Sequence, residues 1–209
     1  PLGSVEVAPL EMAAGYSVFA NQGIYSKPIY ILKVLDRNGR ILEENRITQK
    51  QLITKDNAYI ITNMLQGVLI PGGTGAALGS TLKVPAAAKT GTTDEFKDAW
   101  FIGFTPDICC AVWVGYDRGK NVNLAGGVAA GPIWAAFINK TTPNLSGRDF
   151  LRPENINIYN ICLDSGLIAS ESCPRKVEMA FREGTEPESI CYEHLSHWGW
   201  LLSTKLPVD

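Results

Sequence analysis

Apolar side chains recur at helical spacing in three stretches of the chain. The first stretch follows Pro9, a residue typical of a first helical turn, and Asn21-Gln22-Gly23 ends it. The second follows Thr54, which can cap a helix, and stops at the glycine-rich residues 71–75. The third follows Gly126-Gly127. The apolar positions are Leu10, Ala13, Ala14, Val18 and Phe19; Ala58, Ile61, Leu65, Val68 and Leu69; and Ile133, Trp134, Phe137 and Ile138. This pattern predicts three helices.

Short apolar runs bounded by turn residues predict strands. Residues 30–36 and 41–43 flank Arg37-Asn38-Gly39-Arg40, which is typical of a hairpin turn, so we expect these two runs to pair. Three further runs occupy residues 87–93, 100–105 and 109–116. Pro106-Asp107 joins the last two tightly, which predicts antiparallel pairing.

The character of the chain changes near Pro143, where Pro, Asn, Ser and Cys become frequent and the periodicity weakens. We therefore expect two parts. Residues 1–142 are predicted to form an α/β (α+β) body, with helices packed on an antiparallel sheet. Residues 143–209 are predicted to form a loop-rich, cysteine-containing tail.

Composition excludes several classes of function. Of the 209 residues, 45% are hydrophobic and 19% are charged, which is ordinary for a packed protein. The net charge of -2 gives no reason to expect nucleic acid or an anionic membrane surface as a partner. No apolar run approaches the ~18 residues of a membrane helix, so no membrane span is expected in this chain. Both histidines, His194 and His197, lie near the C-terminus, which argues against a His-based catalytic site in the body.

The run Lys89-Thr90-Gly91-Thr92 carries the most specific chemistry. Because side chains alternate along a strand, Thr90 and Thr92 share one face and their hydroxyls can together bind a carboxylate. The backbone N–H of Thr92 is placed to donate to an oxyanion, and Gly91 leaves room for a substrate backbone. Lys89 lies on the opposite face, so its ammonium must reach around the edge of the strand.

Two other interpretations of this run are open to the sequence. A surface strand with a lysine and small polar residues has the same letters, and a lone Lys-Thr-Gly is a weak signal. A phosphate-binding loop also ends in Lys-Thr, but it needs glycine directly before the lysine and again five residues earlier. Ala88 and Lys83 stand at those places, so the sequence does not fit a phosphate-binding loop.

The surrounding residues raise the specificity of the run. Lys89–Thr93, Asp98–Phe101, Gly103, Pro106-Asp107 and Val112–Asp117 together closely resemble the class A penicillin-binding proteins, which are bifunctional peptidoglycan synthases. The resemblance implies the C-terminal portion of a penicillin-binding-protein/β-lactamase-like transpeptidase fold. It also implies a D,D-transpeptidase that cross-links D-Ala-D-Ala stem peptides through an acyl-serine intermediate, is trapped by β-lactams and uses no cofactor.

The same resemblance assigns roles to residues of this chain. Lys89 is implied as the electrostatic and proton-relay lysine, and Thr90 and Thr92 as the residues that hold the terminal carboxylate. The N–H of Thr92 is implied as half of the oxyanion hole. Gly91 and the loop from Thr93 to Lys97, with Phe96 at its tip, are implied to border the substrate groove. No metal ligand is implied at this site.

The nucleophile of the family lies in Ser-x-x-Lys, and its partner motif is Ser-x-Asn. The resemblance is dense over residues 2 to about 140 and places both motifs upstream of residue 1. We therefore expect that this chain lacks the serine nucleophile, is inactive alone and is completed by an N-terminal remainder of the same protein. The resemblance also implies the extracytoplasmic face of the bacterial inner membrane, with an anchor outside this chain.

Two competing functions are consistent with the same residues. A D,D-carboxypeptidase would use water in place of the acceptor amine, and the sequence does not separate it from a transpeptidase. A noncatalytic peptidoglycan- or β-lactam-binding module would use the carboxylate-binding threonines alone. Covalent labelling by penicillin separates the two classes, because a binding module would show only reversible occupancy.

The five cysteines fall into two groups. Cys109 and Cys110 lie on a strand expected to be central and buried. The other three lie in the tail, which in the resembling family faces an oxidising compartment, and a Cys173–Cys191 disulfide with Cys162 free is expected there. The alternative is a Cys3His zinc site with His194 as the fourth ligand, because Cys191-x-x-His194 has ligand spacing. Either role would be structural.

Overall fold

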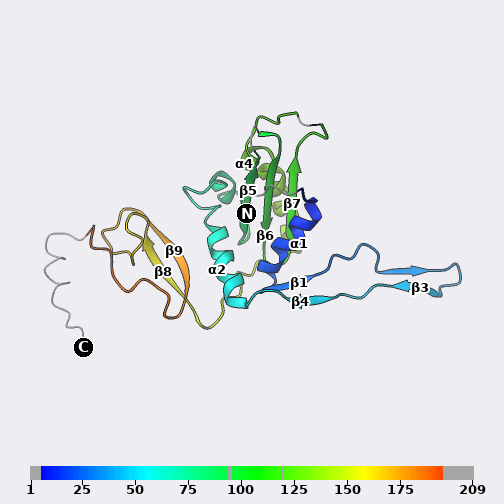
Figure 1. Ribbon diagram of the computed structural model, residues 1–209, viewed down its shortest axis with the longest axis horizontal. Coiled ribbons are helices and arrows are strands. Elements are labelled where there is room, and N and C mark those ends of the chain that lie inside the picture. The colour runs from blue at the N-terminus through cyan, green and yellow to red at the C-terminus, as the bar shows by residue number, and fades with distance from the viewer. Residues whose placement is uncertain (1–5, 94–95, 119, 195–209) are drawn as a thin grey trace. The chain divides into compact units, whose positions relative to one another are not determined.

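The computed structural model describes residues 6–93, 96–118 and 120–194 (Figure 1). The chain divides into two compact units, Pro1–Leu151 and Arg152–Asp209. Residues 2–5 of the stretch resembling the family, and residues 195–209 of the predicted tail, lie outside the described residues. Within the described part, no helix combines the length and apolar character needed to cross a membrane.

The body of the first unit is built on a three-stranded antiparallel sheet. Its strands are β5 (Ala87–Thr92), β6 (Ala99–Phe104) and β7 (Cys109–Val114), in the order β5-β6-β7. The predicted antiparallel pairing of β6 with β7 is confirmed, and Thr90 pairs with Phe101 of β6. The expectation of a central strand at Cys109 and Cys110 is wrong, because β6 lies in the middle and both cysteines are only half-buried.

The turn between β6 and β7 forms hydrogen bonds with residues that follow α5 and η2. The Thr105 hydroxyl accepts the N–H groups of Asp107 and Ile108, each at 3.2 Å. The Asp107 carboxylate in turn accepts the backbone N–H of Ser146 at 2.8 Å and the Ser146 hydroxyl at 2.6 Å. These contacts join residues 143–151 to the first unit. The units therefore separate after Leu151 rather than after residue 142.

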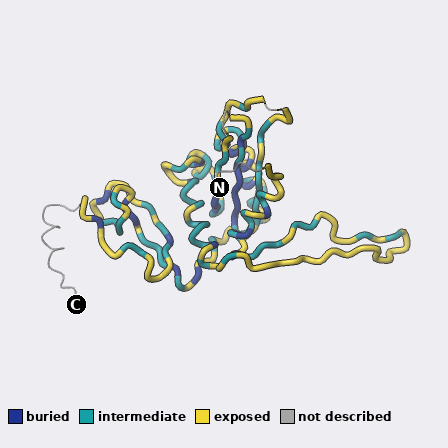
Figure 2. The backbone as a smooth tube through the Cα atoms, viewed as in Figure 1, coloured by how far each residue is buried: buried dark blue, intermediate teal, exposed yellow. Residues whose placement is uncertain are grey.

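One face of the sheet carries the helices α4 (Gly126–Ala129) and α5 (Gly131–Thr141), followed by the 3-10 turn η2 (Thr142–Asn144). Trp134 of α5 is fully buried, lies 5.0 Å from the Phe101 ring and donates from Nε1 to the carbonyl of Gly103 at 3.2 Å. Figure 2 shows the dark blue of buried residues on this sheet. The buried core residues are Leu69, Ala86, Ala88, Phe101, Ala130, Trp134, Ala135 and Ile138.

The opposite face carries α1 (Pro9–Ala20) and α2 (Lys55–Gln66). Phe104 lies three positions after Phe101 and so points to the other side of β6, where its ring is 6.5 Å from that of Phe19 in α1. Pro9 starts α1 as predicted, and the Thr54 hydroxyl caps α2 at 3.3 Å. The predicted second helix reaches Leu69, whereas α2 ends at Gln66, and the short α3 (Ala76–Gly79) was not predicted.

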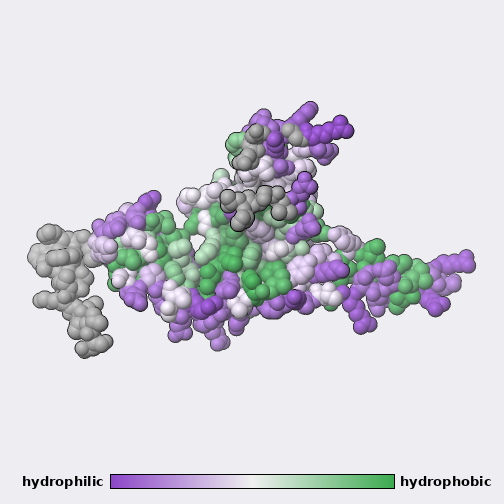
Figure 3. Space-filling model, viewed as in Figure 1, coloured by the Kyte–Doolittle hydropathy of each residue, from purple (hydrophilic) through white to green (hydrophobic). Residues whose placement is uncertain are grey.

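Between α1 and α2 the chain forms a hairpin arm of two successive ladders. Its strands are β1 (Ile24–Ser26), β2 (Lys33–Leu35), β3 (Ile41–Glu44) and β4 (Gln49–Gln51), with β2 paired to β3 and β1 to β4. The predicted turn is confirmed, because the Asp36 carboxylate accepts the N–H groups of Asn38 and Arg40, and Gly39 has φ 80°. Figure 3 shows exposed apolar atoms along this arm and a polar tip. These apolar residues include Tyr30, Ile31, Leu32, Leu42 and Ile47.

The second unit contains two long strands where a loop-rich tail was expected. β8 (Ile156–Cys162) and β9 (Lys176–Arg182) pair antiparallel over seven residues each. Buried and exposed residues do not alternate regularly along β8, which is consistent with the weak alternation of apolar and polar residues in its sequence. Beside the hairpin, a small core is made by Cys162, Cys173 and Cys191.

Candidate active site on the Lys-Thr-Gly strand

The predicted site residues lie along β5 and the loop that follows it. Among the described residues β5 pairs with β6 alone, so the strand forms one end of the sheet, as expected. Thr90 and Thr92 share the face that carries α4, because both contact the α4 segment or its neighbours. The alternation predicted for the two hydroxyls is therefore confirmed.

The Thr92 hydroxyl is held by the start of α4. Its Oγ1 accepts the backbone N–H of Gly126 at 3.1 Å. Gly126 lies against the sheet so closely that a Cβ at this position would be 2.2 Å from the carbonyl oxygen of Trp100 and 2.4 Å from that of Gly91. Only glycine can lie this close to the sheet at position 126, and the close packing brings its N–H within hydrogen-bond distance of Thr92 Oγ1.

The Thr90 hydroxyl meets a residue that sequence reasoning did not assign to the site. Its Oγ1 lies 2.9 Å from Oγ1 of Thr74, and either oxygen can donate. Thr74 belongs to the glycine-rich segment after α2, and its carbonyl oxygen would lie 2.7 Å from a Cβ at Gly127. In the sequence, Thr74 stands in the glycine-rich residues 71–75 that stop the second helix, and nothing there connects it to Thr90.

Gly91 and Lys89 occupy the other face of β5. A Cβ at Gly91 would lie 3.0 Å from Cβ of Trp100. Any side chain larger than glycine at this position would therefore crowd its neighbour on β6. Lys89 is exposed, and its ammonium donates to the carbonyl oxygen of Thr90 at 2.6 Å. The long side chain therefore folds back along the strand to the backbone of Thr90.

The loop after β5 is fixed at both ends. The Thr93 hydroxyl accepts the N–H of Asp98 at 2.8 Å, and the Asp98 carboxylate accepts the indole N–H of Trp113 at 2.8 Å. Phe96 is exposed and has φ 54°, and its carbonyl accepts the N–H of Val122 at 2.7 Å. Residues 94–95 of the predicted groove-bordering loop lie outside the described residues.

One serine of the chain does have lysine three positions later, which the expectation of an upstream nucleophile overlooked. Ser80-Thr81-Leu82-Lys83 follows α3, and Ser80 is the C-cap residue of that short helix. The Ser80 side chain is exposed and donates to the carbonyl of Ala77 at 3.4 Å, and Lys83 is exposed. The match in spacing therefore lies in an exposed turn, without a buried base beside the hydroxyl.

A concave region lies on the α1 side of the body. It encloses about 630 Å³ between α1 and the base of the arm. Its lining includes Leu10, Val18, Tyr25 and Ile53, and none of its residues belongs to β5 or α4. This hollow is thus separate from the threonine pair.

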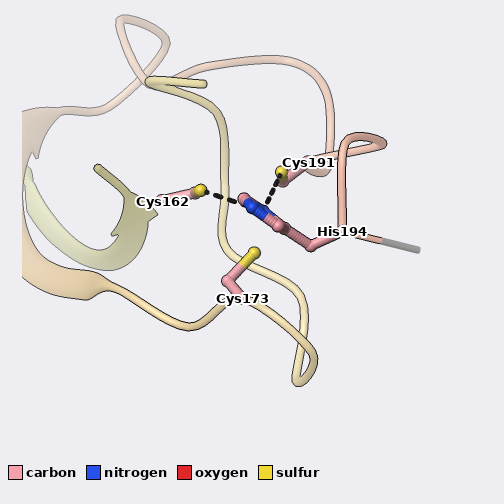
Figure 4. A group of neighbouring side chains, drawn as sticks. All are labelled: Cys162, Cys173, Cys191 and His194. Atoms are coloured by element: carbon pink, nitrogen blue, oxygen red, sulfur yellow. Dashed lines mark hydrogen bonds between the residues drawn. The ribbon is translucent and has the colours of Figure 1, made fainter. Parts of the chain in front are cut away.

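The thiols differ sharply between the two units. Burial, followed by the neighbouring Cys110, raises the pKa of Cys109 to about 12, which leaves this thiol protonated. In the second unit Cys162, Cys173, Cys191 and His194 point toward one another (Figure 4). All the cysteines are free thiols, so the expected Cys173–Cys191 disulfide is absent from the structure. Burial by itself would raise the pKa of Cys162, but hydrogen bonds from Ser165 and Asp164 lower it to about 6.

Two protein-family models match this chain. The model of the penicillin binding protein transpeptidase domain matches residues 1–139, and that of the penicillin-binding protein 1A C-terminal domain matches residues 152–196. Penicillin-binding protein 1A of Aquifex aeolicus is 42% identical over 193 residues, covering 91% of this chain and 26% of the relative. Penicillin-binding protein 2D of Bacillus subtilis is 30% identical over 198 residues, covering 91% and 28%. The chain thus spans about a quarter of the length of these relatives.

Solved structures agree with this assignment. Penicillin-binding protein 1A from Haemophilus influenzae superposes with a TM-score of 0.76 at 26% identity, covering 88% of this chain and 33% of that one. Penicillin-binding protein PonA1 from Mycobacterium tuberculosis superposes with a TM-score of 0.64 at 30% identity, covering 73% and 42%. The predicted fold class and family resemblance are confirmed. The chain belongs to the class A penicillin-binding proteins, with residues 1–139 in their transpeptidase domain and residues 152–196 in the C-terminal domain of the penicillin-binding protein 1A type.

Proposed function

We propose that this chain supplies the carboxylate-binding strand of a penicillin-sensitive D,D-transpeptidase that cross-links peptidoglycan stem peptides. The serine nucleophile is then contributed by an N-terminal segment of the same protein, which carries the Ser-x-x-Lys and Ser-x-Asn motifs. In this proposal the cross-linking reaction takes place at the extracytoplasmic face of the inner membrane.

The main support for this proposal is that the hydroxyl groups around Thr90 and Thr92 keep hydrogens that a ligand can accept. A threonine hydroxyl has one hydrogen to donate and two lone pairs. Thr92 Oγ1 already accepts from Gly126, so its hydrogen remains available to a ligand. Thr74 and Thr90 need only one of their two hydrogens between their oxygens, so the other also remains available. One donor from Thr92 and one from the Thr74–Thr90 pair, on the same face of β5, suit a ligand that only accepts, such as a carboxylate.

Lys89 adds the charge that a carboxylate requires. Its ammonium uses one N–H on the Thr90 carbonyl, which leaves two of its three donors. Held at the backbone of Thr90, this cation would reach around the strand edge and attract the C-terminal carboxylate of D-Ala-D-Ala or the carboxylate of a β-lactam. It also favours loss of a proton from a nearby serine hydroxyl as the nucleophile attacks.

The reaction then proceeds in two steps. The serine oxygen forms a bond to the carbonyl carbon of the penultimate D-Ala, the oxyanion is met by the N–H of Thr92, and the terminal D-Ala leaves with the serine proton on its amine. An acceptor amine attacks the acyl-serine, forms the cross-link and returns a proton to the serine oxygen. With a β-lactam the amide of the ring breaks instead, and the leaving amine stays attached.

Stopped-flow acylation by penicillin tests this assignment in the intact protein. Thr92→Val keeps the shape of the side chain and removes its hydroxyl, so the acylation rate is expected to fall about 10- to 100-fold. The matched control is Thr48→Val, on the exposed arm, which should leave the rate unchanged. An unchanged rate in Thr92→Val would remove Thr92 from the carboxylate site.

The same assay separates the competing functions. A noncatalytic module would show reversible occupancy without a covalent adduct. A carboxypeptidase would release D-Ala from a stem peptide and show no transfer to an added amine. Transfer of the acyl group to the amine is the result expected of the transpeptidase.

A further inference from the structure

We propose that Cys162, Cys173, Cys191 and His194 together bind one zinc ion, which holds the second unit together. The residues come from the end of β8, from the loop between β8 and β9, and from the segment after β9 (Figure 4). This inference is independent of the proposed function, because it shares no residue with the Lys-Thr-Gly strand.

The distances fit a tetrahedral site. One ligand atom from each residue lies within 4.8 Å of all the others. The Nδ1 atom of His194 is 3.4 Å from Sγ of Cys162 and 3.3 Å from Sγ of Cys191. A tetrahedral zinc ion with bonds of ~2.3 Å to sulfur and ~2.0 Å to nitrogen separates its ligand atoms by roughly 3.5–3.8 Å. Only small adjustments would therefore place all four atoms around one ion.

The orientation of the His194 imidazole also supports a zinc site. Its Nε2 atom lies 3.4 Å from Oδ2 of Asp164, and Asp164 is also paired with Arg175. A carboxylate at Nε2 favours the tautomer with its proton there, which leaves the Nδ1 lone pair directed at two sulfur atoms. Carboxylates that bind the other ring nitrogen commonly orient histidine ligands of zinc in this way.

The backbone brings the ligands together from separate segments. The N–H of Cys191 donates to the carbonyl of Ile168 at 2.7 Å, and the N–H of Cys162 donates to that of Leu167 at 2.9 Å. The N–H of Ser170 donates to Sγ of Cys173 at 3.3 Å, which orients this sulfur. These bonds hold the sulfur-bearing residues in place through main-chain contacts.

A zinc ion explains the composition of this core better than packing does. Within the described part of the chain, the three buried thiols have Leu167 and Ala169 as their partly buried apolar neighbours. A hydrophobic cluster this small contributes little to folding, and domains of this size are commonly stabilised by metal or disulfides. A disulfide would join two of the sulfurs and leave the third beside the histidine. One ion uses all four groups, and a set of three sulfurs and one nitrogen suits zinc.

Metal content provides the first test. Intact protein purified under reducing conditions should retain about one zinc ion more per chain than Cys191→Ser or His194→Phe. His194→Cys should keep the ion, because it restores a fourth ligand. The matched control is Cys110→Ser, a half-buried thiol of β7, which should leave the zinc content unchanged. Equal zinc content in the unaltered protein and Cys191→Ser, or a Cys173–Cys191 disulfide in the native protein, would overturn the proposal.

X-ray absorption at the zinc edge provides a test that needs no variant. The expected shell contains about three sulfurs at ~2.3 Å and one nitrogen at ~2.0 Å. A shell of nitrogen and oxygen without sulfur would overturn the proposal. So would protein that binds no zinc when the reduced chain is supplied with the metal.

Discussion

The hydroxyl oxygens of Thr74 and Thr90 lie 2.9 Å apart, which joins the glycine-rich segment after α2 to the Lys-Thr-Gly strand. Thr74 is sixteen positions upstream of Thr90 and touches it by its side chain. The contact holds the Thr90 hydroxyl in place, and whichever oxygen accepts in it keeps its own hydrogen for a ligand. Thr74 is therefore a positioning residue for the proposed carboxylate site.

Replacing Thr74 by valine should slow acylation less than replacing Thr92. A typical neutral hydrogen bond contributes about 1 kcal/mol, so a roughly 3- to 10-fold lower acylation rate is expected for Thr74→Val in the intact protein. The dissociation constant for a β-lactam carboxylate should rise alongside, whereas the melting temperature should change little. A Thr74→Ser variant, which keeps the hydroxyl, should restore the rate. Full activity in Thr74→Val would show that the Thr74 contact does not position Thr90.

The close approach of Gly126 to β5 predicts a large effect of a single methyl group. Gly126→Ala places its Cβ 2.2 Å from the Trp100 carbonyl oxygen, so α4 has to shift away from the strand. Overpacking of this kind costs about 1–3 kcal/mol, and the shift should also withdraw the N–H from Thr92. Denaturant unfolding and acylation rates measure the two consequences.

The control for that variant is Gly15→Ala. Gly15 lies within α1, and a Cβ there would meet nothing within 4 Å. Alanine has the higher helix propensity, so Gly15→Ala should be neutral or stabilise the body by up to about 1 kcal/mol. Equal stability of the Gly126→Ala and Gly15→Ala variants would contradict the packing described for α4.

The Ser146 contact predicts a pH effect on the body. Hydrogen bonds from the Ser146 side chain and then its backbone hold the pKa of Asp107 below its ordinary value. A carboxyl whose pKa is lowered by folding stabilises the folded state above its unfolded pKa of about 3.9, and this stabilisation is lost as the pH falls through the folded pKa. Ser146→Ala should therefore raise the pKa of Asp107 and lower stability at neutral pH, but not at strongly acidic pH.

Carboxyl titration by NMR, together with unfolding at two pH values, measures this effect. Ser80→Ala is a suitable control, because Ser80 contacts only the backbone of its own turn through the Ala77 carbonyl. A stability difference for Ser146→Ala that stays the same at acidic and neutral pH would show that the contact does not act through ionised Asp107.

Removal of zinc should loosen the second unit selectively. A strong chelator added to the reduced protein is expected to increase amide hydrogen exchange in β8 and β9, because metal-dependent small domains open when the ion leaves. Exchange in β5, β6 and β7 should stay the same, and added zinc should restore protection. Unchanged exchange in β8 and β9 after the metal has been removed would show that no ion supports this hairpin.

The body of the fold could be predicted because its signals are local. Pro9, Thr54 and the Asn38-Gly39 turn act on their own neighbours, and the structure confirms the two helices and the hairpin that they mark. The placement of the Thr90 and Thr92 hydroxyls on one face also followed from alternation along one strand. Thr74 could not be assigned in this way, because its contact with Thr90 exists only once α2 and β5 are packed.

The second unit was harder to predict for a physical reason. β8 and β9 pair over their full length, but the cluster beside them is made of cysteines, and Ile156 and Ile161 are the large apolar residues buried in β8. Strand periodicity is therefore weak, and the segment resembles a loop in composition. The convergence of Cys162 with Cys191 depends on backbone contacts of Leu167 and Ile168, which no spacing of the cysteines encodes.

In the proposed mechanism, penicillin becomes attached to a serine outside this chain, and this chain contributes the strand that binds its carboxylate. The most direct measurement is mass spectrometry of the intact protein, and of the 209-residue chain alone, after incubation with penicillin, followed by peptide mapping of any adduct. We expect one adduct on a serine outside these residues, and none on the chain alone. An adduct on Ser80, or on any other residue of this chain, would contradict it.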